Sequence, residues 1–162
     1  GHHIDKLVVV DICNKTYPGG HEEIFKAIRE ADVAHKEDRQ VIFDFLKDRL
    51  HDEGTIQFLL KNLQRKKEGG YEWKMNYALL EESYPSILSE VGSAYSHFDR
   101  PTLFVKGAFS PYIAAGDEER IQKQFPNSRL TTIPNAGHWV HADQPEEFTR
   151  QVLHFLNQNL ST

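Results

Sequence analysis

The chain has 162 residues, 39% hydrophobic and 11% aromatic, which is enough for one compact domain with a core and short for two. Its 24 acidic residues outnumber 19 basic ones, and no basic stripe is interleaved with aromatic residues, which argues against nucleic acid as a partner. The single cysteine, Cys13, excludes an internal disulfide, and no Cys/His cluster has the spacing of a zinc site. We therefore expect a globular protein of a reducing compartment without a structural metal.

The start of the chain gives no sign of membrane insertion or export. No apolar run reaches the length of a membrane span, and no signal peptide precedes the segment IDKLVVVDI. The expectation is a cytoplasmic protein. The opening GHH is either a purification-tag remnant or native sequence, and we assign no function to His2 or His3.

The segment KLVVVDI, residues 6–12, is a nearly continuous β-branched run. This is the pattern of a strand that is buried on both faces of a parallel sheet. A parallel strand needs neighbours and crossover helices, and the few residues before it cannot supply them. We assign residues 1–13 to a core strand whose partners lie elsewhere.

Residues 14–98 have the composition of helices. Gly69 and Gly70 indicate a turn, and the segment KMNYALLEESYPSILSEV predicts two helical pieces broken near Pro85. The prediction is an all-helical insertion between two strand-like regions. Its apolar residues recur at helical spacing in three groups: Ile24, Phe25 and Ile28; Val41, Ile42, Phe45, Leu46 and Leu50; Ile56, Leu59, Leu60 and Leu63.

Residues 99–162 return to alternating strand and helix, which predicts an α/β class. The segment PTLFVKG predicts an apolar strand, DEERIQKQF a helix stopped by Pro126, and SRLTTIPNAG a more polar strand nearer a sheet edge. Asp143 is the predicted N-cap of the last helix. Glu146 stands three residues on, and Pro145 lies within the first turn.

Three polar residues follow the predicted strands, namely Asp11, Ser110 and His138. Because the carboxyl ends of parallel strands form the ligand crevice of an α/β sheet, we expect these side chains to converge. Gly137 permits an unusual backbone angle just before the histidine, and Trp139 is placed to wall its ring on one side. His138 would then act as a general base and later as an acid.

Each of these positions also has a purely structural interpretation. A single loop histidine such as His138 is most often solvated or hydrogen-bonded. Asp11 is able to cap the turn after its strand, and Ser110 stands in ordinary turn sequence. Cys13 reads as an inert packed thiol, and His141 as a surface residue near the last helix. Residue spacing by itself leaves both interpretations open.

Taken together, KLVVVDI, the helical insertion, PTLFVKGAFSPYI and IPNAGHWVHADQPEEF resemble the α/β-hydrolase superfamily. The likeness is greatest to small bacterial acyl-ester esterases of the YbfF type, and NAGHWVHADQPEEF is its most specific part. It implies a parallel sheet with flanking helices, a helical lid over residues 14–98, and the last two strand and helix units over residues 99–162. It also implies an acyl-ester substrate and no cofactor.

The sequence departs from this family at the nucleophile. Members carry an HGxxG-like oxyanion loop and a G-x-S-x-G nucleophile elbow, and neither motif occurs in these 162 residues. Ser93 and Ser110 both lack the pattern. The resemblance therefore implies the C-terminal portion of an esterase, inactive without its nucleophile. The sheet edge of such a portion predicts self-association, or pairing with the missing N-terminal half.

A second departure concerns the acid of the triad. Many relatives carry it after the strand that TLFVKG resembles, where this chain has Ser110. Asp11 is then the natural partner of His138, with Ser110 assisting or holding the ring itself, and Asp117 is a weaker alternative.

The resemblance also bears on the substrate and on the type of reaction. Three aromatic residues are expected to contact the substrate: Trp139, Phe109 and Tyr112. Haloperoxidase, dehalogenase and C–C hydrolase reactions share the same histidine framework and remain alternatives to ester hydrolysis.

Overall fold

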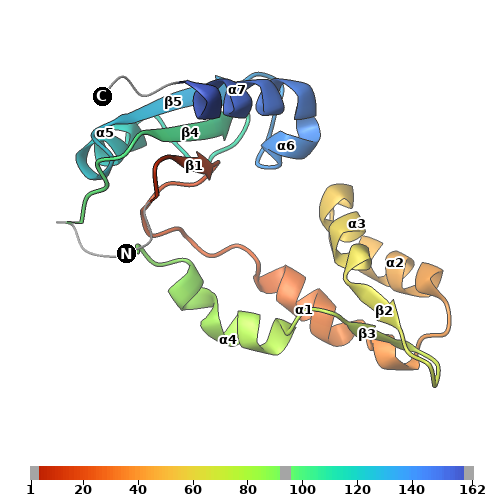
Figure 1. The fold of residues 1–162 in the computed structure, drawn as a ribbon. Helices are drawn as coiled ribbons and strands as arrows, with labels where there is room; N and C mark the ends of the chain where they lie inside the picture. Colours follow the sequence, from red (N-terminus) through yellow and green to blue (C-terminus); the bar gives the residue numbers. More distant parts are fainter. Residues whose placement is uncertain (1–3, 92–95, 159–162) are drawn as a thin grey trace. The chain divides into compact units, whose positions relative to one another are not determined.

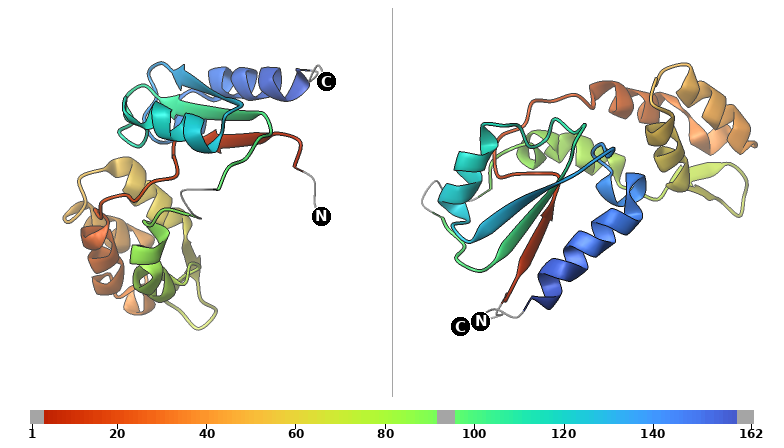
Figure 2. Two further views of the ribbon diagram at one scale, coloured as in Figure 1. Left: turned by 90° about the vertical axis from the view of Figure 1, so that its left-hand side faces the viewer. Right: turned by 90° about the horizontal axis from the view of Figure 1, so that it is seen from above.

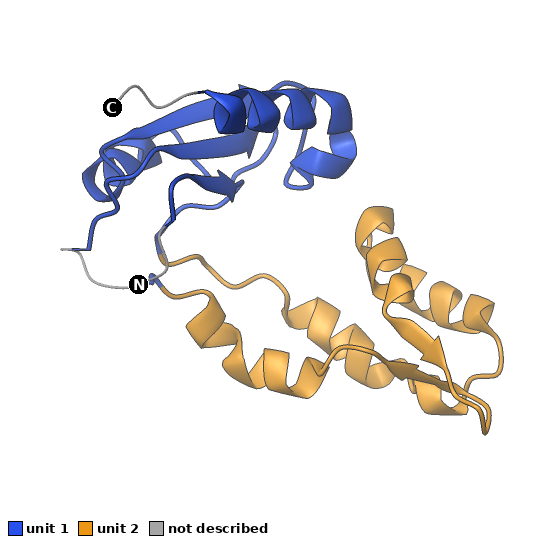
Figure 3. Cartoon of the chain, viewed as in Figure 1, with its two compact units in different colours: residues 1–15, 90–162 blue, residues 16–89 orange. Residues whose placement is uncertain are grey.

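The structure is a computed structural model that describes residues 4–91 and 96–158. His2, His3 and Ser93, which the sequence analysis mentions, lie outside the described residues. The chain divides into two compact units (Figure 3). Unit 1 comprises residues 1–15 and 90–162, and unit 2 comprises residues 16–89.

Unit 1 is built on a parallel sheet in the order β1–β4–β5 (Figure 1). The strands are β1 (Leu7–Val10), β4 (Thr102–Gly107) and β5 (Ser128–Ile133), with Leu7 opposite Thr102 and Thr102 opposite Ser128. Because the strands run in the same direction, the residues that follow them meet at one edge of the sheet. The predicted α/β class is confirmed.

Helices cover both faces of this sheet (Figure 2). On one face Leu103 and Val105 pack with Phe155 of α7 (Pro145–Asn157). On the other, Phe104 packs with Ile121 of α5 (Asp117–Gln124). Burial on both faces explains why successive residues of β4 are apolar. A short helix, α6 (Val140–Asp143), connects the segment after β5 to α7.

Unit 2 is a separate, mainly helical unit with its own core. Its helices are α1 (Glu22–Glu30), the 3-10 helix η1 (Val33–His35), α2 (Arg39–Lys47), α3 (Glu53–Lys61) and α4 (Tyr77–Ile87). The core collects the apolar face of each of the first helices, including Ala27, Ile42, Leu46, Ile56 and Leu59. Among the described residues, no helix combines the length and the apolar composition that a membrane span requires.

The prediction of an all-helical insertion was wrong, because unit 2 contains a β-hairpin. Strands β2 (Leu63–Arg65) and β3 (Tyr71–Trp73) pair antiparallel around the predicted turn. Gly69 and Gly70 have φ of 99° and 73°, values that glycine adopts without strain. A Cβ on Gly70 would lie 1.9 Å from the carbonyl oxygen of Ala34. Strands of three residues are too short to show alternation in a sequence.

The predicted break at Pro85 was also wrong. Helix α4 continues through Pro85 and ends two residues later, at Ile87. A proline near the end of a helix removes a single hydrogen bond, so the helix tolerates it there. The consequence is one helix where two pieces were expected.

Candidate active site

The structure brings Asp11, Ser110 and His138 together at the carboxyl edge of the unit 1 sheet. Nδ1 of His138 lies 2.7 Å from Oδ2 of Asp11, across 127 positions of sequence. The hydroxyl of Ser110 donates to the same carboxylate oxygen. Asp11 has no exposed surface, whereas the His138 side chain is 43% exposed. The buried carboxylate of Asp11 is thus hydrogen-bonded to one nitrogen of the solvent-accessible His138 ring.

The backbone around Asp11 explains how a carboxylate is kept in this buried place. Asp11 directly follows β1 and has φ of 50°, a left-handed conformation that aspartate tolerates better than most residues. Its N–H donates to Val105 O (2.7 Å), and the N–H of Gly107 donates to its Oδ1 (3.1 Å). Both carboxylate oxygens therefore have hydrogen-bond donors, as burial of a charged group requires.

The turn that carries His138 is held by a carboxylate of its own. The N–H of Gly137 donates to Oδ2 of Asp143 over 2.7 Å. The prediction that Asp143 caps the last helix was wrong, because the N-cap of α7 is Gln144, which makes no side-chain cap bond. Asp143 ends α6 instead and reaches back to the histidine turn. The sequence pattern pointed to Asp143 but did not predict the direction of its side chain.

Backbone contact between β4 and the histidine turn is unusually close at Gly107. A Cβ on Gly107 would lie 2.1 Å from the carbonyl oxygen of Gly137 and 2.6 Å from that of Ala136. Next to it, Phe109 N–H donates to Ala136 O over 2.9 Å. Only glycine allows such an approach. Gly107 therefore fixes both the acid, through its N–H, and the turn that presents the histidine.

The loop that carries Ser110 is fastened along its length. Ser110 is 7% exposed, and its Oγ accepts the N–H of Tyr112 over 3.3 Å. Lys106 Nζ donates to Ile113 O (2.6 Å) at the next residue. Ser110 donates to the acid, on the Nδ1 side of the histidine, which is not the place of a nucleophile that Nε2 would deprotonate. The arrangement suits an orienting role for Ser110.

Asp117, the alternative acid, is occupied elsewhere in the loop. Its carboxylate pairs with Lys15 and accepts the N–H of Ala114 over 2.8 Å. Burial raises the pKa of Asp117, but the hydrogen bonds from Lys15 and Ala114 outweigh it and hold this pKa below its usual range. Asp11, not Asp117, is the carboxylate bonded to His138.

The ring of Tyr112 stacks on His138. The expectation that Trp139 walls the imidazole on one side stays a prediction. The centroids of Tyr112 and His138 lie 4.0 Å apart, and the planes differ by 17°. Trp139 stands at the N-cap of α6 and is 37% exposed, and Phe109, in the neighbouring loop, is 74% exposed. A contact of these aromatic residues with substrate stays a prediction.

The geometry defines what the site can do chemically. With Nδ1 bonded to a carboxylate, a neutral imidazole carries its proton on Nδ1 and leaves Nε2 as the base. The tautomer is inferred from the hydrogen bond. Within residues 4–91 and 96–158, no three His, Cys, Asp or Glu side chains are placed to hold a metal ion together. The site thus supplies a base and its orienting acid.

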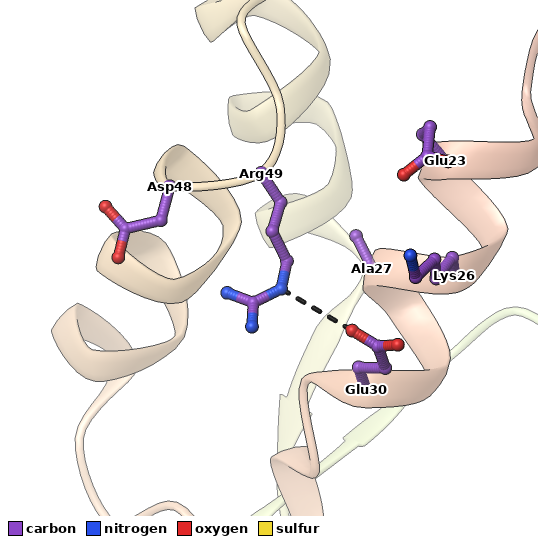
Figure 4. A pocket seen from close by; sticks show the side chains of 6 residues that line it. All are labelled: Glu23, Lys26, Ala27, Glu30, Asp48 and Arg49. Carbon is purple, nitrogen blue, oxygen red and sulfur yellow. Dashed lines mark ion pairs between the residues drawn. The ribbon is translucent and has the colours of Figure 1, made fainter.

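Unit 2 contains a cleft of about 410 Å³ lined by charged side chains (Figure 4). Figure 4 shows Arg49, which follows α2, directed across the cleft towards Glu30 of α1. The other charged lining residues are Glu23 and Lys26 of α1 and Asp48, next to Arg49. Arg49 Nε lies 3.6 Å from Glu30 Oε2. No histidine or hydroxyl group lines this cleft.

Comparison with known proteins gives several relatives, although no family model matches the chain. Esterase YbfF of Escherichia coli (strain K12) is 37% identical over 155 residues, which are 95% of this chain and 58% of that protein. The sn-1-specific diacylglycerol lipase ABHD11 of Mus musculus is 34% identical over 159 residues, 94% of this chain and 51% of that protein.

Solved structures give a matching result. A marine microorganism esterase superposes with a TM-score of 0.89 at 35% identity, covering 93% of this chain and 60% of that one. The present chain therefore spans about 50 to 60% of the length of these three relatives.

Proposed function

Because the chain belongs to the α/β-hydrolase superfamily, with esterases and lipases as its relatives, we propose that the protein is a serine carboxylic-ester hydrolase. These 162 residues would contribute the acid and the base. The observation that carries the proposal is the 2.7 Å bond between Asp11 Oδ2 and His138 Nδ1, which leaves Nε2 on the opposite edge of the ring.

The mechanism follows the roles that this bond permits. Nε2 of His138 takes the proton of a serine hydroxyl as that hydroxyl attacks the ester carbonyl, and then returns it to the leaving alcohol. The same nitrogen next activates water, which hydrolyses the acyl-enzyme. Asp11 keeps the Nδ1 proton in place and stabilises the imidazolium, and Ser110 holds Asp11. The serine itself would come from sequence outside these 162 residues.

Apolar side chains next to the site support an acyl substrate. Ile12 follows Asp11 and is 46% exposed, Phe109 precedes Ser110, and Trp139 follows His138. Each polar group of the site thus has an exposed apolar neighbour in sequence. We propose that these side chains border the site, where they would favour burial of an acyl chain beside the reacting carbonyl.

Labelling with a serine-reactive phosphonate tests the proposal. The polypeptide of 18.7 kDa is expected to stay unlabelled in an intact-mass spectrum, and the protein carrying a G-x-S-x-G elbow is expected to take up one phosphonate. His138→Gln should slow this uptake by roughly 10³-fold or more, because the serine loses its base. Uptake at an unchanged rate in His138→Gln would refute the assignment of the base.

Association is a second candidate function, favoured by β1. All four of its residues, Leu7–Val10, are apolar but only half-buried, and β1 forms an edge of the sheet in the described part of the chain. An apolar edge strand is a template for pairing with another strand. Sedimentation velocity tests this: a dimer or a hetero-complex supports pairing, and a stable monomer at high concentration contradicts it.

A further inference from the structure

Tyr112 contacts the candidate site at two points. Its ring stacks on the imidazole of His138, with centroids 4.0 Å apart and planes 17° from parallel. Its main-chain N–H donates to Oγ of Ser110, the hydroxyl that in turn donates to Asp11. One residue therefore contacts the base directly and the acid through Ser110.

The stack supplies a restraint that the hydrogen bond does not. The bond from Nδ1 to Asp11 fixes one corner of the imidazole, but the ring is still able to twist about that bond. Nε2, on the far side, would sweep through an arc as the ring twists. A second ring packed flat against the imidazole opposes this twist and leaves both nitrogens uncovered at the ring edges.

The backbone of Tyr112 is firmly placed for this task. Pro111 fixes its own φ just before it, and Ile113, just after it, is fully buried with its carbonyl bonded to Lys106. Because both neighbours are held, the tyrosine ring is presented on a rigid segment. A preorganised support of this kind is what positioning of a reacting group requires.

We propose that Tyr112 is a positioning residue, which holds the plane of the His138 imidazole so that Nε2 faces the nucleophile. This role rests on the proposed function, since it concerns the same base. It gives Tyr112 a contact with the base, and the expected contact with substrate stays a separate prediction.

Proton NMR of the His138 ring tests the placement without any need for activity. In the wild-type protein its carbon-bound protons should be displaced upfield by the tyrosine ring, compared with those of His35, whose side chain is 80% exposed. Tyr112→Phe keeps an aromatic ring and should keep the displacement, whereas Tyr112→Leu should abolish it. The control is Phe98→Leu, which also removes an aromatic ring. Phe98 precedes the amino end of β4, whereas the site lies at the carboxyl end, so the His138 shifts should not change. Displacement that persists in Tyr112→Leu would overturn the stack.

Kinetics of the complete enzyme test the positioning role. Tyr112→Leu should lower kcat for an acyl ester by about 10-fold and leave KM within about 2-fold, and Tyr112→Phe should restore kcat. A raised KM with kcat unchanged would overturn the proposal in favour of substrate contact. Absence of ester hydrolysis in the complete wild-type protein would instead overturn the proposed function, and the proton shifts would still support or reject the stack.

Discussion

The two units of this chain are organised by contacts of very different range in sequence. In unit 1 the pairing of β1, β4 and β5 joins both ends of the chain, and the bond between Asp11 and His138 spans 127 positions. In unit 2 α2 packs against α3 and β2 against β3, and α1 packs against α4, where Arg29 pairs with Glu81 across 52 positions. The contacts of unit 2 lie within residues 16–89, whereas the candidate site exists only after both ends of the chain have met in unit 1.

This difference leads to different expectations for substitutions in the two units. A change at a strand end of unit 1 should alter the relative position of distant side chains, and hence the chemistry. A change in the core of unit 2 should alter stability without touching the bond between the acid and the base. Each of the following substitutions tests this contrast between the two units.

The largest effect is expected from Asp11→Asn. With its NH₂ group facing Nδ1 of His138, the new amide donates to Nδ1 and cannot accept the Nδ1 proton. This favours the wrong tautomer and should lower kcat of the complete enzyme by about 10³- to 10⁴-fold. The measurements are kcat for an acyl ester and the ¹⁵N shifts of the imidazole, which report the tautomer. Asp5→Asn, at an exposed position just before β1, is the control. Turnover equal to wild type would remove Asp11 from the mechanism.

In unit 2 the corresponding change is Ile42→Ala. Ile42 is fully buried in the helical core, so the truncation should cost about 2 to 5 kcal/mol of unfolding free energy. Hydrogen exchange should rise in residues 16–89, and the His138 ring signals should stay in place. Val41→Ala, at a neighbouring position that is 48% exposed, is the matched control. Faster exchange in β4 and β5 would show that the units are energetically coupled.

Gly107→Ala should lower both the stability of unit 1 and kcat of the complete enzyme. The added Cβ would meet the carbonyl oxygens of Gly137 and Ala136, so the histidine turn must move. We expect a loss of about 1 to 3 kcal/mol in stability and a kcat reduced by about 100-fold. Gly116→Ala is the control, because a Cβ at Gly116 meets nothing within 4 Å. If Gly107→Ala equals Gly116→Ala in both measurements, the histidine turn does not depend on this contact.

Sequence patterns predicted the parallel sheet with flanking helices in unit 1 and the convergence of Asp11, Ser110 and His138. They succeeded because apolar runs mark strands, and because parallel strands place the residues that follow them at one edge. The hairpin of unit 2 was not predicted, since strands of three residues carry no periodicity.

The features of the site that were missed depend on the directions of side chains and on which loops meet. Residue patterns in the sequence do not reveal either. Asp143 has the chemistry of a helix cap, and its position before Glu146 fits one, yet its carboxylate bonds Gly137. The stack of Tyr112 on His138 and the close approach at Gly107 arise only when two loops meet. A glycine at the end of an apolar strand was the one available signal for the latter.

The smallest effect is expected from Glu147→Gln, which removes a partly exposed carboxylate of unit 1. Hydrogen bonds from Arg150 and Gln151 hold the pKa of Glu147 at about 2, below its ordinary 4.5. Because the pKa is lowered in the folded protein, this pair stabilises the fold above pH 4.5, and the contribution is lost as the pH falls towards 2.

Glu147→Gln should therefore melt slightly below wild type at pH 7 in low salt, and the difference should shrink at pH 3 or in 1 M salt, because water and ions screen an exposed pair. Melting curves at the two pH values measure this, with kcat unchanged. Asp11 and Glu147 are both carboxylates of unit 1 that accept hydrogen bonds. Only the buried Asp11 is bonded to a histidine, and it alone is expected to determine the tautomer of that ring. A large salt-independent loss in Glu147→Gln would contradict that distinction.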